Sequence, residues 1–398
     1  MQTQNQLSAK TIARASLWMT AIGQLGIVVY LPAFPEMVQV FHTTNAMIQN
    51  SLAAFLIGFG CSQLLYGIWS DHKGRKQVLV ISLLAFLITL LATFFVHSAG
   101  LYIFIRLLQG ITVGATMTIS RVILRDSFND TYLPKAAAYP SLGFAVGLGF
   151  GPVVSGWLTS HFGWQSCTAF LAAFTTVYLI WFWFAFPETH AKENRPTAKP
   201  TVKKLLQMHL NVVTHRQFIQ LLFGGIFAYS VVTTYNVLSP FLLQNTFHLT
   251  AKQYGNVAVL IAIAYYAGAW LNKHIVLRLG SFNVIKIGLA LIMVAGLTLI
   301  LWSIWHEKAL IPFLIGTFVA VFGQALVWSN IIASSIRFFK ENAGVASAVF
   351  SCLQMVFTGI ISSTLSLVPS HSTITIAIIF LLLGIIAYSV VRPIIKNK

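Results

Sequence analysis

Arg106 is a charged residue within an apolar stretch, Gly-Leu-Tyr-Ile-Phe-Ile-Arg-Leu-Leu-Gln-Gly at 100–110. A guanidinium stays protonated at physiological pH and offers five N–H donors, so it suits carboxylates, phosphates and carbonyl oxygens. Among apolar residues such a charge needs partners and is a candidate binding group. We expect backbone carbonyls, Gln24, Tyr30, Glu36 or a negative charge on a bound molecule. The alternative is an arginine whose head reaches the polar end of the segment.

Carboxylates that could bind and release a proton are the second chemical feature. A carboxyl group in apolar surroundings has a raised pKa and can carry a proton between two environments. The eight acidic residues fall between apolar segments or at their ends, and none falls in the middle of one. Proton coupling is therefore expected at Glu36, which follows Pro32 and Pro35 at the end of the first apolar segment, or not at all.

Uncharged polar and aromatic residues recur within the apolar segments. A ligand cavity is mostly apolar with a few polar groups, and these residues together with Arg106 could supply such a lining. Any one of them could instead form a hydrogen bond between neighbouring helices. The set comprises Gln24, Tyr30, Asn50, Gln63, Gln109, Tyr139, Tyr235, Asn236, Tyr265, Gln324, Trp328 and Gln354.

The composition identifies the elements that must position these residues. Hydrophobic residues make up 57% of the 398 residues and charged residues only 8%, against about 45–50% and about 25% in an ordinary soluble domain. A membrane-spanning helix needs about 20 mostly apolar residues. Windows of that length predict an all-α polytopic membrane protein with twelve spans, near 12–33, 46–69, 77–97, 100–124, 135–158, 166–187, 215–241, 253–273, 282–304, 309–332, 343–368 and 371–392.

Basic residues fall on one side of this predicted topology. Of the 25 Lys and Arg residues, only Arg106, Lys252 and Lys308 fall on the other side. Because Lys and Arg are enriched in cytoplasmic loops, both termini are expected in the cytoplasm, and the first apolar run is expected to stay as the first span. The net charge of +17 therefore predicts contact with anionic membrane lipids rather than with nucleic acid.

A polar stretch separates two sets of six predicted spans. We expect an N-terminal six-helix bundle over 1–189, a cytoplasmic linker over 190–214 and a C-terminal six-helix bundle over 215–398. Within the linker, 202–213 is expected to form a short amphipathic helix on the membrane surface. An internal repeat supports the division, because Phe-His-Thr-Thr at 41–44 and Phe-His-Leu-Thr at 247–250 each follow a proline-containing segment end.

The loop between the second and third spans reads Gly67-Ile-Trp-Ser-Asp71-His-Lys-Gly74-Arg75-Lys76. It combines a glycine that could allow close helix approach, an acid, several bases and a glycine that can take a positive φ. It resembles the G-x-x-x-D-x-x-G-R-K signature of the major facilitator superfamily, which latches the two halves on the cytoplasmic side. By this resemblance Asp71 would pair with a basic residue or a helix N-terminus, and Arg75 with an acid such as Asp126, beside Arg125.

The stretch 106–128, with R-L-L-Q-G and then S-R-V-I-L-R-D-S-F, is similar to the fourth span of the Bcr/CflA branch of drug:proton antiporters in that superfamily. The Pro-Ala-x-Pro end of the first span and Pro-Glu-Thr at 187–189 fit the same branch. Two positions depart from the pattern. Val28 stands where the branch has an aspartate, so proton coupling is not implied there. Asn272 replaces the acid in the second-half copy of the loop, so that copy should latch more weakly.

Small residues crowd the fifth predicted span. Gly143, Gly147 and Gly151 are four residues apart, so they share a helix face against which another helix can pack closely, and Pro152 is expected to kink the helix. With Gly156 they resemble the G-x-x-x-G-P-x-x-x-G antiporter motif associated with exporters. Close packing and a role in efflux are both open.

These resemblances imply a major facilitator fold, with two six-helix bundles around a central cavity, and transport of a small organic molecule. An enzyme is not expected, because no nucleophile–base pair or metal-ligand cluster occurs at a useful spacing. We expect efflux of drug-like or toxic compounds across the inner membrane by a monomer without a cofactor. The alternative is uptake or export of an anionic metabolite or a polycarboxylate siderophore without the usual proton coupling, because of Val28 and Arg106.

Overall fold

The computed structural model describes residues 2–128, 132, 136, 138–190, 202–305, 309–339, 343–369 and 372–396. Over these residues the secondary structure is helical, and twelve segments are long and apolar enough to cross a membrane, which confirms the predicted class and the predicted number of spans. The elements are α1 (Gln2–Val28), η1 (Leu31–Ala33), α2 (Phe34–Val40), α3 (Asn45–Lys73), α4 (Arg75–Ala92), η2 (Thr93–Phe95), α5 (Ala99–Ser127), α7 (Ala138–Phe162), α8 (Gln165–Ala185), α9 (Val202–Val213), α10 (Arg216–Phe241), η4 (Leu242–Thr246), α11 (Ala251–Leu279), α12 (Ser281–Trp305), α13 (Leu310–Ile336), α14 (Ala343–Leu365) and α15 (Thr373–Lys396).

The first span is longer than predicted. It runs from Ala9 to Val40 and includes two short helices, η1 and α2, after α1 ends at Val28. Pro32 and Pro35 lie in the first turns of η1 and α2, where a residue without an N–H costs no helical hydrogen bond. The predicted end of the span at residue 33 is therefore wrong, because the prolines begin new helical turns.

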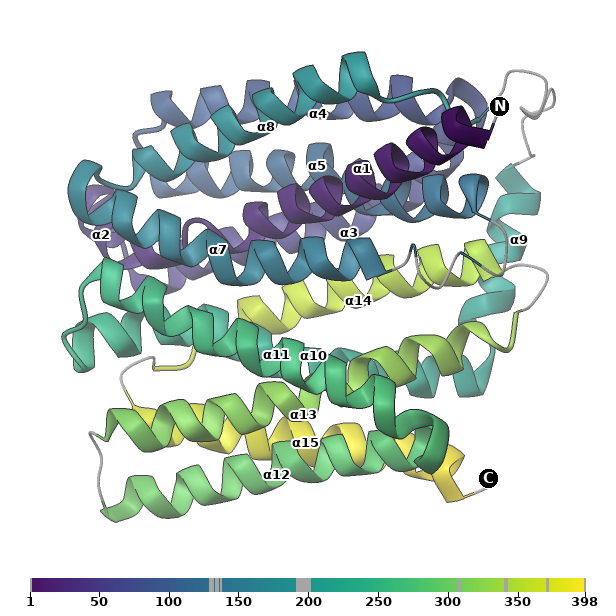
Figure 1. Ribbon diagram of the computed structural model, residues 1–398. Helices are drawn as coiled ribbons and strands as arrows, with labels where there is room; N and C mark the ends of the chain where they lie inside the picture. The colour runs from purple at the N-terminus through teal and green to yellow at the C-terminus, as the bar shows by residue number, and fades with distance from the viewer. Residues whose placement is uncertain are drawn as a thin grey trace.

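Two groups of helices lie side by side in Figure 1, with α1 to α8 in the upper part and α10 to α15 in the lower part. We call these groups the first half and the second half. They meet mainly through two helix pairs, α3 with α14 and α7 with α11. The helix α9 has the bounds predicted for it, Val202–Val213. The predicted linker boundary itself stays a prediction, because residues 191–201 lie outside the described residues.

The two ends of the molecule differ in charge. We call the end that carries α9, the turn between α3 and α4 and the last turn of α5 the basic end, and the end that carries α2 the opposite end. In Figure 1, α9 lies on the right and α2 on the left. Gly74 has a φ of 98°, as predicted, and Gly280 at the matching turn of the second half has a φ of 78°. Both turns therefore have a positive φ at a position where glycine is the favoured residue.

The repeated Phe-His-x-Thr segments fold in the same way. His42 and His248 are the non-glycine residues with positive φ in the described part of the chain, at 47° and 55°. Two residues later Thr44 and Thr250 cap α3 and α11, each by accepting a hydrogen bond from the backbone N–H three residues ahead. The repeat seen in the sequence is therefore also a repeat of backbone conformation.

Candidate functional site

Arg106 lies inside the first half, on α5, and is 1% exposed. Its Nη1 donates to Oε1 of Gln109 at 2.9 Å, and its Nη2 donates to the carbonyl oxygen of Gly26 at 2.8 Å. The guanidinium carbon lies 4.2 Å from the ring centre of Phe55 and 4.9 Å from that of Tyr30, within the range of cation–π attraction. The predicted contacts with a backbone carbonyl and with Tyr30 are confirmed.

Tyr30 and Gln109 complete this buried cluster. The Tyr30 hydroxyl lies 2.9 Å from Oγ1 of Thr168 on α8, and Nε2 of Gln109 donates to Oγ1 of Thr93 at 2.9 Å. Both side chains are fully buried. In this conformation the cluster connects helices of the first half, so the prediction that Tyr30, Arg106 and Gln109 line the substrate cavity does not hold here.

Glu36 lies at the opposite end, on α2, where it is half-buried. Its Oε1 accepts a hydrogen bond from the backbone N–H of Trp164 at 3.1 Å, at the N-terminus of α8, where a carboxylate is favourable. Both ion pairs among the described residues involve Arg75, so Glu36 is in neither. Its role in proton coupling stays a prediction.

A cavity of about 50 Å³ lies between the two halves. Pockets for drug-sized ligands measure about 300–1,000 Å³, so the cavity of this conformation is too small for such a ligand and would have to widen to accept one. Three helices of each half contribute, α3, α5 and α7 with α10, α13 and α14. The lining residues are Gln63, Met117, Arg121, Phe144, Tyr229, Trp328, Ser351, Gln354 and Met355.

Three of the predicted polar and aromatic residues, Gln63, Trp328 and Gln354, line this cavity. Two others join the halves without lining the cavity. Asn50 accepts a hydrogen bond at Oδ1 from Oγ of Ser363 at 2.7 Å, and the ring of Tyr265 lies 5.0 Å from that of Phe144.

The other predicted lining residues are not part of the cavity wall. Gln24 is buried on α1, and Tyr235 and Asn236 are buried on α10, while Tyr139 lies in the first turn of α7. Gln324 is fully buried on α13, and neither polar atom of its amide has a hydrogen-bond partner among the described residues. Apolar segments indicate which residues lie within spans, but not which of them face the cavity.

Among the described residues that line the cavity, Arg121 is the one that carries a charge, and it is not among the binding residues predicted from the sequence. Its Nη1 donates to Oγ of Ser351 on α14 at 2.5 Å, so the hydrogen bond crosses between the halves. Its place near the end of a span led to its interpretation as a topology signal. A usable signal was the preceding run 114–120, in which five of the seven residues are Gly, Ala, Ser or Thr, typical of a face that packs on protein.

Arg75, at the basic end, joins α3, α4 and α5 to the segment after α8. Its Nε donates to Oδ2 of Asp126 at 2.9 Å, and its Nη1 donates to Oδ1 of Asp71 at 2.5 Å. The backbone N–H groups of Arg75 and Lys76 donate to the carboxylate of Glu188 at 3.0 and 3.2 Å. The predicted pairings of Arg75 with Asp126 and of Asp71 with a base are confirmed. All of these partners belong to the first half, so a latch between the halves stays a prediction.

The other residues of the loop between α3 and α4, and of its copy in the second half, differ in their contacts with neighbouring helices. At Gly67 an added Cβ would lie 3.8 Å from the nearest atom, so the predicted close helix approach at this glycine is wrong. Arg125 does reach the second half, since its Nη1 would lie 3.0 Å from a Cβ at Gly344 on α14. In the second-half copy, Oδ1 of Asn272 accepts a hydrogen bond from Nδ2 of Asn330 at 2.6 Å, a neutral bond in place of an ion pair.

The sequence model described as Major Facilitator Superfamily matches residues 17–363. The chain belongs to the major facilitator superfamily. It is 22% identical to the bicyclomycin resistance protein homolog of Haemophilus influenzae over 338 residues, which cover 85% of this chain and 84% of the relative. It is 23% identical to multidrug resistance protein D of Escherichia coli over 375 residues, which cover 92% and 91%. These relatives confirm the resemblance to the Bcr/CflA branch.

The fold of this facilitator is also found in a solved structure. The crystal structure of a D-xylose-proton symporter matches with a TM-score of 0.80 at 15% identity and covers 98% of this chain and 99% of that chain. At this identity the likeness concerns the fold. The predicted transporter architecture is thereby confirmed.

In this facilitator the glycines of α7 pack against two different helices. An added Cβ at Gly143 would collide with the carbonyl oxygen of Leu17 on α1, and Gly147 also faces α1, so the predicted close packing is confirmed. At Gly156 an added Cβ would instead collide with the carbonyl oxygen of Ala251 on α11. The motif therefore reaches from the core of the first half to the boundary with the second.

Val28 packs against the same helix. It is fully buried, and a methyl group of its side chain would lie 3.0 Å from a Cβ at Gly151, the residue before Pro152. The position that carries an acid in the Bcr/CflA branch is thus part of an apolar helix contact in this facilitator.

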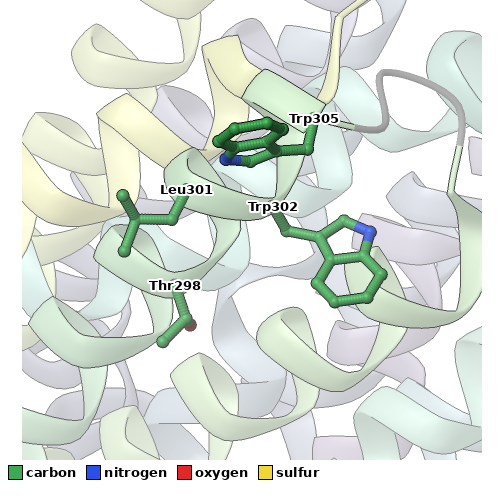
Figure 2. A pocket seen from close by; sticks show the side chains of 4 residues that line it. All are labelled: Thr298, Leu301, Trp302 and Trp305. Carbon is green, nitrogen blue, oxygen red and sulfur yellow. The ribbon is translucent and has the colours of Figure 1, made fainter.

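A second hollow, open and about 480 Å³ in volume, lies on the surface of α12. Figure 2 shows the side chains that line it, Thr298, Leu301, Trp302 and Trp305. Leu301 is 54% exposed and Trp305 is 81% exposed, and indole rings at the end of a span suit the boundary between lipid tails and headgroups. This surface fits the predicted contact with membrane lipids rather than a substrate site.

Proposed function

We propose that this facilitator exports drug-like or toxic compounds across the inner membrane of a bacterium by alternating access. The observation that carries the proposal is the cavity between the halves, with three helices of each half in its wall. The relatives in Haemophilus influenzae and Escherichia coli, whose names specify bicyclomycin and multidrug resistance, support both the direction and the class of compound.

We propose further that the basic end and both termini face the cytoplasm. The turn between α3 and α4 and the last turns of α5 carry Lys73, Arg75, Lys76, Arg121 and Arg125, and such residues are retained on the cytoplasmic side. The transporter then works as a monomer surrounded by lipid, because one chain supplies both walls of the cavity.

In the proposed cycle a compound enters from the basic end when α5 and α14 separate. That step breaks the hydrogen bond between Arg121 and Ser351 and moves Arg125 away from Gly344. The ion pairs of Arg75 with Asp71 and Asp126 hold α3, α4 and α5 as one unit while the halves rock. This is the latch role that we propose for the loop.

We propose that any proton coupling in this cycle uses Glu36. It lies at the opposite end, close to the outer solution in the proposed orientation, and Val28 occupies the usual position of the acid. Flux into proteoliposomes should be measured with and without an imposed pH gradient for wild type and Glu36→Gln. Gradient-driven accumulation that survives Glu36→Gln would exclude Glu36 as the coupling group.

The proposed efflux is tested in a bacterial strain without its own drug exporters. Cells with the wild-type protein should accumulate less chloramphenicol and bicyclomycin than cells with the empty vector and should grow at higher concentrations of both. Cells with Gly156→Leu should resemble the empty vector, because that variant cannot close the opposite end. Equal accumulation in wild-type and vector cells, at comparable membrane expression, contradicts the proposal.

A further inference from the structure

The chemical groups that face the central cavity are hydrogen-bond donors and aromatic rings. We propose that this cavity selects amphiphilic organic anions, with a carboxylate or sulfonate against Arg121 and a flat apolar body against Trp328. The inference rests on the proposed function as an exporter and names the class of compound that its cavity accepts.

The charge in the cavity is positive. Arg121 is the charged member of the lining, and its hydrogen bond to Oγ of Ser351 is to a neutral group. The described acidic residues have other positions, because Glu36 binds the backbone N–H of Trp164, and the others, Asp71, Asp126 and Glu188, contact the segment at Arg75. Arg121 is exposed in this conformation, and a guanidinium on the wall of a cavity favours a ligand with negative charge and disfavours a cation.

Two further donors in the cavity have no partner. The Nε2 atoms of Gln63 and Gln354 are buried and make no hydrogen bond in the described part of the chain, and each of these residues is 2% exposed. Both residues line the cavity, Gln63 from the first half and Gln354 from the second. A buried donor without an acceptor is costly, so the site is completed by a ligand that brings oxygen acceptors.

Aromatic side chains supply the apolar part of the site. The ring of Trp328 lies 5.1 Å from that of Tyr229, and Phe144 of α7 in the first half is a further aromatic residue of the lining. Rings of this kind present flat faces to an aromatic ligand. The site therefore combines a charge-bearing pole with an aromatic surface.

Opening of the basic end frees the charged group of the site. Ser351 belongs to the second half and Arg121 to the first, so separation of α5 from α14 removes the serine and leaves the guanidinium donors to the ligand. Arg106 does not take this role in the described conformation, because its side chain is not part of the cavity lining and its Nη1 and Nη2 donate to Gln109 and Gly26 inside the first half.

The test compares two dyes with the same xanthene–phenyl framework and opposite charge. Fluorescein is an anion at pH 7.5 and rhodamine 123 is a cation, and binding of each to purified protein in lipid nanodiscs is measured by fluorescence polarisation. Wild type should bind fluorescein more tightly than rhodamine 123. Arg121→Gln should weaken the binding of fluorescein by about tenfold to a hundredfold, and Arg121→Lys should weaken it less. Binding of rhodamine 123 should not weaken in either variant.

Two other variants keep the result independent of folding. Gln354→Met removes one cavity donor at similar volume and should weaken fluorescein by about twofold to tenfold. Arg216→Gln removes an exposed arginine at the start of α10 and should leave both dyes unchanged. Unchanged fluorescein binding in Arg121→Gln, preference of wild type for rhodamine 123, or binding of neither dye overturns the inference.

The failure of this inference and the failure of the proposed function have different signatures. Export of uncharged chloramphenicol by cells, without Arg121-dependent binding of fluorescein, supports the proposed export and contradicts the proposed anion site. Arg121-dependent binding of fluorescein, without export of any compound from cells, supports the proposed anion site and contradicts the proposed export.

Discussion

The boundary between the two halves is built differently at its two ends. At the opposite end the contacts involve backbone, since an added Cβ at Gly156 would collide with the carbonyl oxygen of Ala251 and one at Gly255 with that of Pro152. At the basic end the contacts involve long side chains, Arg121 with Ser351 and Arg125 beside Gly344.

Hydrogen bonds to backbone extend the contrast at the opposite end. Nε2 of Gln244 donates to the carbonyl oxygen of Pro32 at 3.0 Å, and the N–H of Lys252 donates to Oγ of Ser160 at 3.1 Å. Backbone cannot move aside by changing a rotamer, whereas an arginine can. The opposite end should therefore close only in one arrangement, and the basic end should open by small steps.

The largest expected effect comes from Gly156→Leu. A leucine at this position overlaps α11, and overpacking of this kind costs about 1–3 kcal/mol or more, so the opposite end stays open and efflux falls to background. The measurement is labelling of a cysteine at Ser160 by an impermeant maleimide together with export of chloramphenicol. Gly100→Leu, at the same end with no atom within 4 Å of its added Cβ, is the matched control. Export by Gly156→Leu at the wild-type level would contradict the view that close backbone contact between α7 and α11 is needed to close the opposite end.

Asp126→Asn should have the next largest effect and should change stability rather than opening. The Arg75 side chain is 4% exposed, and loss of a charged hydrogen-bond partner costs about 1.5–3 kcal/mol. Thermal unfolding in detergent should show the loss. Asp71→Asn should cost less, about 0–1 kcal/mol, because the Asp71 side chain is 50% exposed. A change in spin-label distance between α5 and α14 in Asp126→Asn would show that the network does connect the halves.

Ser351→Ala should have a smaller effect, and on opening alone. It removes the acceptor of the Arg121 hydrogen bond, which is worth about 0.5–1.5 kcal/mol, so the open basic end becomes about twofold to tenfold more populated. Distances between spin labels on α5 and α14 report this population. Ser366→Ala, whose hydroxyl bonds within its own segment to Ser363, serves as the control. A shift in population well above tenfold would contradict the expectation that the basic end opens by small steps.

Glu36→Gln should have the smallest effect on stability. The amide oxygen of glutamine can still accept from the N–H of Trp164, so the change in unfolding free energy should stay within about 0.5 kcal/mol. Glu36→Ala loses the acceptor and should cost about 1 kcal/mol. Thermal shift measurements of the two variants check this order. A large loss in Glu36→Gln would mean that the negative charge itself holds α2 to α8.

The parts that could be predicted from sequence are those set by local chemistry. Apolar length gave the twelve spans, the loop signature gave the pair of Arg75 with Asp126, and Gly74 has the positive φ expected of its turn. The continuation of the first span to Val40 could not be predicted from Pro32 and Pro35, because proline occurs both where a helix ends and in the first turn of a new helix.

The parts that could not be predicted depend on which side of a helix meets which neighbour. Arg106 and Arg121 lie on the same helix, yet one is enclosed by Gly26 and Gln109 and the other lines the cavity. Depth in the apolar segment favoured Arg106 as the binding group, because a deeper charge is costlier. Depth is not decisive, since the first half supplies Arg106 with its own partners.

The cavity arginine has an electrical consequence. With an organic anion bound at Arg121, the loaded site carries little net charge across the membrane, while the empty site carries one positive charge back. A potential that is negative inside draws the empty site inward, with about 2.3 kcal/mol available per charge per 100 mV, which corresponds to roughly a fiftyfold concentration ratio. An exporter with valine at position 28 could thus expel anions by voltage alone, and its turnover would then be measurable as a current.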